Sequence, residues 1–294
     1  MRVPQVVTTA EELRNKEGKL EEALKLLKEH EKTSSKQDLL FVQQAIAILM
    51  YDTGHTVEAL SKHKEAVQSA KKVGNEFIQA DALTRIGWEM WMKNENNAKV
   101  LDYQDKAWKI VEKDIENKDL MKVGANIWAA KGNIYFGAKE YSKALDSYNK
   151  SIDLAQKCQF KQRISTVKGD IANVYIEQKK YDKARQMLEE MYSFSKDNYK
   201  HAVLASLIRL ARLYQIEESG FFNISKSEKF LDEALQLSKT EHWRRDEAEV
   251  YDGKYWLYLK KGEKDKAEES KIKAIEIYTE LGMKHRIKNL KRSN

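Results

Sequence analysis

The residues of this sequence that could carry chemistry are suited to recognition rather than to catalysis. The six histidines are scattered along the chain, and each is expected at the surface. The sequence contains no Gly-rich phosphate loop, no HExxH zinc motif and no cluster of cysteine and histidine. Carboxylate pairs are common, but at helical spacing they are expected to pair with lysines of the same helix. We therefore predict a protein with no enzymatic activity, no bound metal and no cofactor.

Arginine, amide and tryptophan side chains are the groups that could bind a partner. Arg209 and Arg212 lie one helical turn apart, and a guanidinium group can bind a carboxylate or a phosphate through two parallel hydrogen bonds. The amides of Asn133 and Asn173 could each pair with the N–H and C=O groups of an extended peptide. Aromatic and arginine side chains are frequent anchors of protein interfaces.

Each of these side chains also has a purely structural interpretation. The two arginines could pair with Glu217 or Glu218 on the same helical surface, which would be a weak interaction. The two asparagines could bond to neighbouring helices, and tryptophans at helical spacing are often part of a core. The sequence leaves these alternatives open.

The composition indicates an all-helical soluble protein. Among 294 residues, 34% are charged, Pro4 is the only proline, and glycine occurs twelve times. The 53 basic and 46 acidic residues are interspersed and give a net charge of +7, a mild bias toward anionic partners. One cysteine, Cys158, excludes an internal disulfide, and a partly buried, inert thiol is expected there. No apolar run could span a membrane and no secretory signal is present, so we expect a cytoplasmic protein without membrane contact.

Residues 126–154 show most clearly how the chain is organised. They predict two amphipathic helices joined at residues 137–140, with large side chains at Trp128, Tyr135 and Tyr148. Small residues, Gly132 and Ala144, stand where the two helix backbones would touch. This order resembles the tetratricopeptide repeat (TPR), although lysine replaces the leucine before the glycine and the closing proline is missing.

The same pattern recurs along the chain with a period near 40 residues. The small position of the first helix falls at Ala47, Gly87, Gly132, Ala172, Ala211 and, exceptionally, Tyr255, with steps of 40, 45, 40, 39 and 44 residues. This period resembles the Rap-type and kinesin-light-chain-type TPR proteins. We therefore predict a helical segment or degenerate repeat at 1–38, a solenoid of six repeats at 39–282, and a basic capping helix at 283–294.

Finer expectations concern the connections between these helices. Residues 1–10 are expected to be loosely structured, with Thr8 or Thr9 as an N-cap, and residues 31–38 to form a polar linker. A long turn near residue 221 carries Phe221 and Phe222, which are expected to be exposed and are a second candidate contact surface.

The resemblance implies an all-α, right-handed TPR superhelix whose first helices line a concave face. Four positions of each first helix would point inward, which also places Phe41, Gln44, Asp81 and Thr84 on that face. An extended peptide or partner protein, which could carry an acidic group, is expected to bind there. The residues expected to bind it are Asn133, Asn173, Arg209, Arg212, Trp88, Trp91, Asn126, Phe136 and Trp256.

Two other functions are compatible with the sequence. The first is a peptide-sensing regulator of the bacterial Rap-like class without an output domain, because about 38 residues before the first repeat are too few for the family's N-terminal helical bundle. The second is an adaptor whose basic surface associates with nucleic acid. Its candidate surface is a C-terminal stripe with no nearby acid in the sequence, for which a solvated helix cap is the simpler explanation; the stripe comprises Lys284, Arg286, Lys288, Lys291 and Arg292. The oligomeric state is left open.

Overall fold

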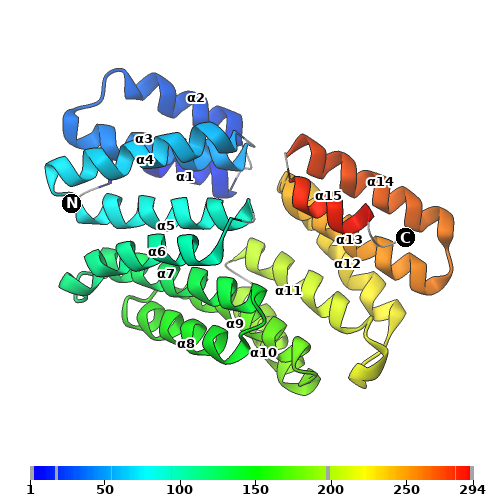
Figure 1. Ribbon diagram of the computed structural model, residues 1–294. Helices are drawn as coiled ribbons and strands as arrows, with labels where there is room; N and C mark the ends of the chain where they lie inside the picture. The colour runs from blue at the N-terminus through cyan, green and yellow to red at the C-terminus, as the bar shows by residue number, and fades with distance from the viewer. Residues whose placement is uncertain are drawn as a thin grey trace. The chain divides into compact units, whose positions relative to one another are not determined.

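The chain folds into α-helices alone wherever its structure is described. The computed structural model describes residues 3–16, 19–53, 55–93, 95–196, 199–281 and 283–291. These residues form fifteen α-helices and two short 3₁₀ helices, with no strand among them (Figure 1). The all-α fold predicted from composition and periodicity is confirmed.

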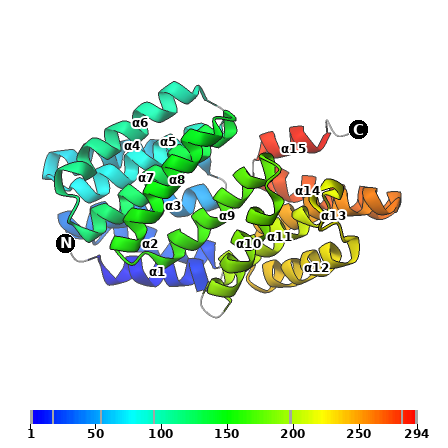
Figure 2. The same ribbon diagram turned by 90° about the horizontal axis from the view of Figure 1, so that it is seen from below.

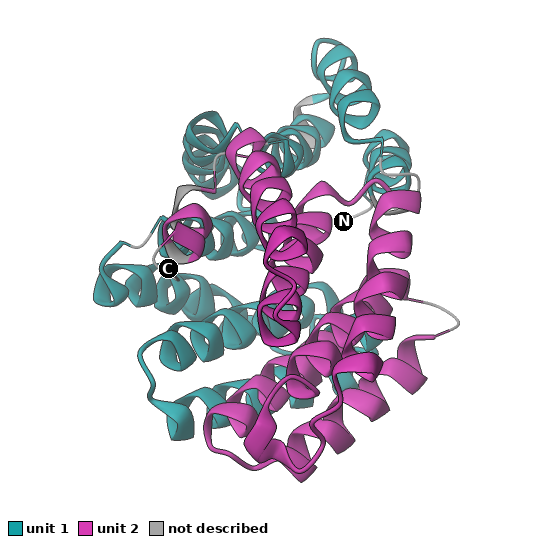
Figure 3. Cartoon of the chain, turned by 90° about the vertical axis from the view of Figure 1, so that its right-hand side faces the viewer, with its two compact units in different colours: residues 1–163 teal, residues 164–294 magenta. Residues whose placement is uncertain are grey.

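The chain divides into two compact units, residues 1–163 and 164–294 (Figure 3). The first contains α1 (Gln5–Lys16), α2 (Leu20–Glu31), α3 (Lys36–Asp52), α4 (Thr56–Val73), α5 (Glu76–Met92), α6 (Asn97–Val111), η1 (Glu112–Asp114), α7 (Lys118–Gly137) and α8 (Tyr141–Lys157). Most of α9 (Lys161–Glu177) belongs to the second, with α10 (Tyr181–Ser195), α11 (Lys200–Leu213), η2 (Glu217–Ser219), α12 (Ile224–Thr240), α13 (Arg244–Lys261), α14 (Lys264–Glu280) and α15 (Lys284–Lys291).

Helices that follow one another in sequence pack together within each unit. In the first unit the pairs are α3 with α4, α5 with α6, and α7 with α8, and α7 and α8 lie side by side in Figures 1 and 2. In the second unit α11 packs on α12 and α13 on α14. Helices such as α8 and α12 are amphipathic, so pairing buries an apolar stripe that a single helix could not cover.

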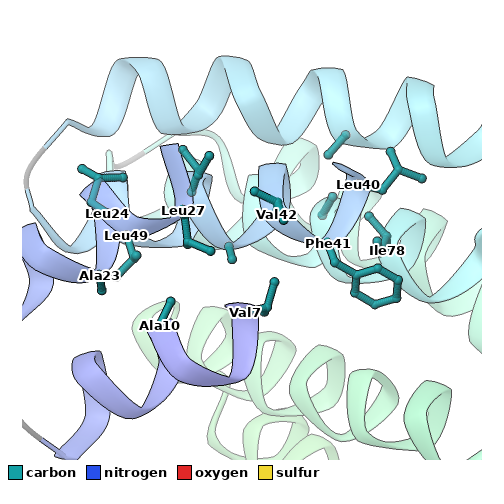
Figure 4. Close-up of a cluster of buried hydrophobic side chains, with 14 of the residues drawn as sticks. Val7, Ala10, Ala23, Leu24, Leu27, Leu40, Phe41, Val42, Leu49 and Ile78 are labelled. Carbon is teal, nitrogen blue, oxygen red and sulfur yellow. The ribbon is translucent and has the colours of Figure 1, made fainter. Parts of the chain in front are cut away.

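The first unit has its N-terminal core among α1, α2, α3, α4 and the first half of α5 (Figure 4). Apolar side chains from these helices meet there and exclude water, which supplies the main stabilising contribution of such a cluster. Its labelled members are Val7, Ala10, Ala23, Leu24, Leu27, Leu40, Phe41, Val42, Leu49 and Ile78.

The helical pair predicted from residues 126–154 has the expected form. Helix α7 ends at Gly137 and α8 begins at Tyr141, so the predicted turn is confirmed. The ring of Tyr148 is buried against Gly132, where a Cβ would lie 2.4 Å from the ring carbon Cε1. The Tyr148 hydroxyl donates to Oδ1 of Asn133 at 2.7 Å. Glycine is needed at position 132 because the tyrosine occupies the space of a side chain.

The turns after α7 and α9 share one backbone geometry despite their different sequences. Lys139 and Lys179 both adopt left-handed conformations, with φ of 61° and 57°. In each turn the following amide donates to a carbonyl of the last helical turn, from Glu140 to Tyr135 and from Lys180 to Tyr175. Many helices end with such a hydrogen bond, and glycine is the residue that most often takes the left-handed conformation there. Its recurrence 40 residues later supports the predicted period.

Two expectations about the N-terminal region are wrong. Helix α1 begins at Gln5, so Thr8 and Thr9 lie inside the helix, and the Thr9 hydroxyl donates to the Gln5 carbonyl at 3.1 Å. Helix α3 begins at Lys36, so the linker is limited to residues 32–35. Ser35 starts α3 because its side chain accepts a hydrogen bond from the Asp38 amide, which is the usual role of an N-cap serine.

Candidate functional site

An open groove in the second unit brings together two of the predicted binding residues, Arg212 and Trp256. It has a volume of about 800 Å³ and is formed by α11, the segment through η2, α13 and α15. Its lining residues are Arg212, Gln215, Ile216, Glu217, Glu218, Asp252, Gly253, Trp256, Lys260 and Arg286. We call this region the Arg212 groove.

Gln215 fixes the floor of the Arg212 groove. Its side chain is buried, and its Nε2 donates to the hydroxyl of Ser227 at 2.9 Å and to the carbonyl of Gly253 at 3.4 Å. These bonds connect α11 to α12 and α13, so the helices that carry Arg212 and Trp256 are held together beneath the groove.

Arg212 is exposed and forms no hydrogen bond or ion pair within the described residues. The acidic residues expected to neutralise it have other partners. Glu217 pairs with Lys260 at 3.2 Å, and Glu218 accepts from Lys179 at 3.1 Å and from the Tyr181 hydroxyl at 2.7 Å. Pairing of Arg212 with these two glutamates is therefore wrong, and its guanidinium is available to a ligand.

Trp256 offers an oriented aromatic surface beside Arg212. Its side chain is 41% exposed, which is unusual for tryptophan. The indole N–H donates to Oδ1 of Asp252 at 3.1 Å, and the ring lies tilted against Tyr255 with centroids 5.0 Å apart. The hydrogen bond and the ring contact fix the indole while its remaining surface faces solvent.

A group of arginines surrounds Glu249 beneath the groove. Nη2 of Arg286 lies 2.8 Å from its Oε1 and Nη2 of Arg245 3.8 Å away. Burial alone would raise the pKa of Glu249, but Arg286, Arg245, Arg212 and Arg209 lower the pKa to about 2. Glu249 is therefore charged under all ordinary conditions and attaches α15 to α13.

Asp252 lies one turn further along α13 than Glu249, and its pKa is shifted in the opposite direction. Burial raises its pKa above the ordinary value, and the attraction of Arg212 and Arg286 does not compensate fully. Below it, the buried Tyr278 hydroxyl has no hydrogen-bond partner among the described residues. The wall of the groove thus contains a carboxylate that is only partly compensated by the neighbouring arginines.

The other predicted residues of the second unit do not line the groove. Arg209 donates from Nη2 to Oδ1 of Asp170 at 3.1 Å and from Nη1 to the Ala205 carbonyl at 3.2 Å, so it connects α11 to α9. Asn173, on α9, is half-buried, and its side chain has no hydrogen-bond partner among the described residues. Phe221 packs under the guanidinium of Arg185 at 4.4 Å, whereas Phe222 is exposed.

The predicted residues of the first unit lie on α5 and α7. Trp88 and Trp91 are half-buried and pack together with ring centroids 5.1 Å apart. Phe136 packs against Tyr141 with centroids 6.1 Å apart. Asn126 is half-buried, and its Oδ1 has no hydrogen-bond partner among the described residues.

The acceptor oxygen of Asn133 already receives the hydrogen bond of the Tyr148 hydroxyl. A peptide that used both the acceptor and the donor of this amide would have to compete with a buried tyrosine.

Positions predicted to face a ligand in the first repeats are instead buried in a polar network. Gln44 donates to Oδ2 of Asp81 at 2.6 Å, and Arg85 donates to the same oxygen at 2.9 Å. His63 is 1% exposed, with Nδ1 3.0 Å from Oε1 of Gln44 and Nε2 3.2 Å from Oε1 of Glu89. The expectation that every histidine is at the surface is wrong for His63, because polar partners from α3 and α5 satisfy both ring nitrogens.

The C-terminal basic stripe is also different from its prediction. No acid is near the stripe in the sequence, but the fold pairs Arg286 with Glu249 of α13. The side chain of Lys284 and the whole of Arg292 lie outside the described residues. The structure thus gives no specific support to nucleic-acid binding by this stripe.

The sequence did not predict three charged residues in or next to the groove: Asp252, Glu249 and Arg286. The repeat register could have found the first two, because they precede Trp256 by one and two helical turns on the inward-facing positions of the last repeat. Arg286 could not be found in this way, since its partner lies 37 residues away on another helix.

No helix in the described part of the chain is both long enough and apolar enough to cross a membrane. Over the same residues, no cluster of histidine, cysteine and carboxylate side chains has the arrangement of a metal site.

Comparison with known proteins identifies the fold. Residues 125–197 match the tetratricopeptide repeat family. No curated protein sequence is significantly similar to the chain. Among solved structures, a Rap protein complexed with Competence and Sporulation Factor has a TM-score of 0.70 at 13% identity, over 94% of this chain and 74% of that one.

Two further structures show the same likeness. Aspartyl phosphate phosphatase F from Bacillus subtilis has a TM-score of 0.60 at 13% identity, covering 92% of this chain and 75% of that one. BtubC (BKLC) from P. vanneervenii has a TM-score of 0.53 at 18% identity, covering 81% and 91%. Residues 125–197 thus match the tetratricopeptide repeat, and the chain has the all-α solenoid fold seen in these structures.

Proposed function

We propose that this protein is a non-catalytic scaffold that binds a partner protein or an extended peptide, and that the Arg212 groove holds part of the partner. The fold supports binding in general, because helical repeats present extended surfaces for recognition. The Arg212 groove is the proposed place of binding because it contains both Arg212 and Trp256.

The observation that carries the proposal is the unpaired guanidinium of Arg212 beside the exposed indole of Trp256. An exposed arginine that only improves solubility would be expected to pair with a nearby glutamate, but Glu217 and Glu218 pair with Lys260 and Lys179 instead. A partner segment with an acidic group next to an apolar side chain would complement both residues. Arginine and tryptophan are also the residue types that contribute most to interface energies.

A capture experiment with two matched variants tests the proposal. The immobilised chain is compared with the Arg212→Ala, Trp256→Ala double variant and with a Lys229→Ala, Phe194→Ala control, whose two residues are exposed in the same unit outside the groove. We expect partners from the source cell extract to be retained by the control and lost by the groove variant. Circular dichroism confirms that each variant is folded.

Retention of the same partner by the groove variant would contradict binding in the Arg212 groove. An Asn173→Ala variant and a Trp88→Ala, Trp91→Ala variant would then test the other predicted contact residues. Asn133→Ala is less useful, because it also removes the acceptor of the Tyr148 hydroxyl.

A second candidate function is that of a peptide-sensing regulator. It is favoured by the likeness over 94% of this chain to a Rap protein complexed with Competence and Sporulation Factor. A sensor must change its population of conformations when its ligand binds, whereas a scaffold need not. Small-angle scattering with and without a synthetic peptide that binds the chain separates the two functions. An unchanged scattering profile at saturation would exclude the sensor.

A further inference from the structure

We propose that Arg212 and Arg286 form one oxyanion site shared by α11 and α15, so that ligand binding and the docking of α15 stabilise each other. This inference rests on the proposed function and names both the ligand chemistry and the regulation of the Arg212 groove. The site takes a carboxylate or a phosphate, which present the same oxygen geometry to a guanidinium.

Helix α15 depends on the rest of the second unit for its structure. It has eight residues, and an isolated helix of this length is not stable in water. Its apolar side packs on the preceding helices through Leu290, which is 3% exposed, and through Ile287. Its polar attachment is the bond from Arg286 to Glu249 of α13. A further contact to α15 would therefore shift its docking equilibrium.

Arg286 can serve Glu249 and a ligand at the same time. A guanidinium group has five N–H donors, and Nη2 of Arg286 is the atom that bonds to Glu249. The Arg286 side chain is 29% exposed and lines the groove together with Arg212. Glu249 therefore holds Arg286 through Nη2 while other N–H donors of this lining residue take no part in the bond.

The charges around the groove leave one cation without an ion-pair partner. Arg209 is paired with Asp170, and Arg286 with Glu249. Arg212 has no ion pair among the described residues. Asp252 lines the same groove, but burial raises its pKa and so disfavours its charged form. An oxyanion placed between Arg212 and Arg286 would give Arg212 a direct ion-pair partner and would contact both guanidinium groups.

Anion titration of the full-length chain, read by two signals, tests the site. The probes are inorganic phosphate, the peptide acetyl-Asp-Phe-amide, and the neutral control acetyl-Asn-Phe-amide. The first signal is the NMR resonance of the Trp256 indole N–H, assigned with a Trp256→Phe variant. The second is the hydrogen exchange of the α15 backbone amides.

We expect at least one anionic probe to bind and the neutral peptide not to bind. Arg212→Gln and Arg286→Gln should each weaken binding by about 10- to 100-fold, the usual loss for a charged hydrogen bond. Lys288→Gln, an exposed charge change on the same helix, should leave binding unchanged. At a probe concentration of about ten times the dissociation constant, exchange of the α15 amides should slow by roughly tenfold. Tighter binding of phosphate would indicate a phosphorylated ligand, and tighter binding of the aspartyl peptide an acidic side chain.

Glu249→Gln separates loss of the site from simple release of α15. This variant removes the charge of the bond that holds α15 but keeps the Arg286 guanidinium, so the α15 amides should exchange faster without a probe and be protected again when the probe binds. If binding depends on Arg212 but neither on Arg286 nor on the state of α15, the shared site is wrong while the proposed function stands. If neither anion binds although the groove captures a partner, the oxyanion chemistry is wrong.

Discussion

The substitution Gly132→Ala tests the closest contact of the α7–α8 pair. A Cβ at position 132 would lie 2.4 Å and 2.5 Å from two ring carbons of Tyr148, whereas non-bonded carbons normally stay about 3.5–4.0 Å apart. The tyrosine is 1% exposed, and its hydroxyl is bonded to Asn133, so the ring has little room to move. The helix backbone or the ring must shift.

The magnitude follows from two opposing effects. Alanine is better than glycine within a helix by about 1 kcal/mol, and overpacking a buried site costs roughly 1–3 kcal/mol or more. We expect Gly132→Ala to destabilise the first unit by about 1–2 kcal/mol. Gly137→Ala on the same helix is the matched control, since its nearest neighbour would be Trp91 at 3.6 Å, an ordinary contact. That variant should be neutral or more stable by up to about 1 kcal/mol.

Urea unfolding followed by circular dichroism measures the two variants, and hydrogen exchange of the α7 and α8 amides localises the effect. Both substitutions change the unfolded chain in the same way, so the difference between them reports the contact with Tyr148. Equal stability of the two variants would refute the reasoning that glycine is required for close approach of the tyrosine.

Three other predictions concern buried charged and polar groups. His63→Leu should destabilise the first unit by roughly 2–4 kcal/mol, because Glu89 loses its buried partner. The substitution of the exposed His55 by leucine should change the free energy of unfolding by less than about 0.5 kcal/mol, and urea unfolding measures both variants. Because the folded-state pKa of Glu249 is lowered to about 2, its stabilisation of about 3 kcal/mol is present above pH 4.5 and is lost as the pH falls toward 2. A Glu249→Gln variant whose urea midpoint keeps the wild-type acid dependence would disprove this. Burial raises the pKa of Asp252, so its charge is unfavourable at neutral pH and this cost vanishes on acidification. Asp252→Asn should therefore raise the melting temperature more at pH 7 than at about pH 4, and an equal change at both pH values would contradict the prediction.

The sequence predicted those features of the fold that depend on neighbouring residues. The turn at residues 137–140, the contact between the two helices of this pair and the period near 40 residues were all readable from the spacing of small and large side chains. Helix formation is governed by contacts three and four residues apart, and repeats add contacts only to their neighbours. Such patterns are visible in a single chain.

The sequence predicted the candidate binding residues less completely, since accessibility depends on side chains from other helices. Gln44 and Asp81 occupy inward-facing register positions, yet each is buried and bonded to the other across α3 and α5. Asn133 has the chemistry of a peptide-binding amide, but Tyr148 occupies its acceptor. Nothing in the local sequence shows that these partners exist.

The amino-acid sequence by itself determined the helical repeats, their register and the residue types suited to recognition. Only the tertiary structure decided that Arg212 has no ion pair among the described residues, that Arg209 is bound to Asp170, and that Arg286 joins the groove from a helix predicted only as a cap. The physical reason is that secondary structure follows short-range periodicity in the sequence. Whether a charged side chain forms an ion pair depends instead on which opposite charges the folded chain places within a few ångströms of it.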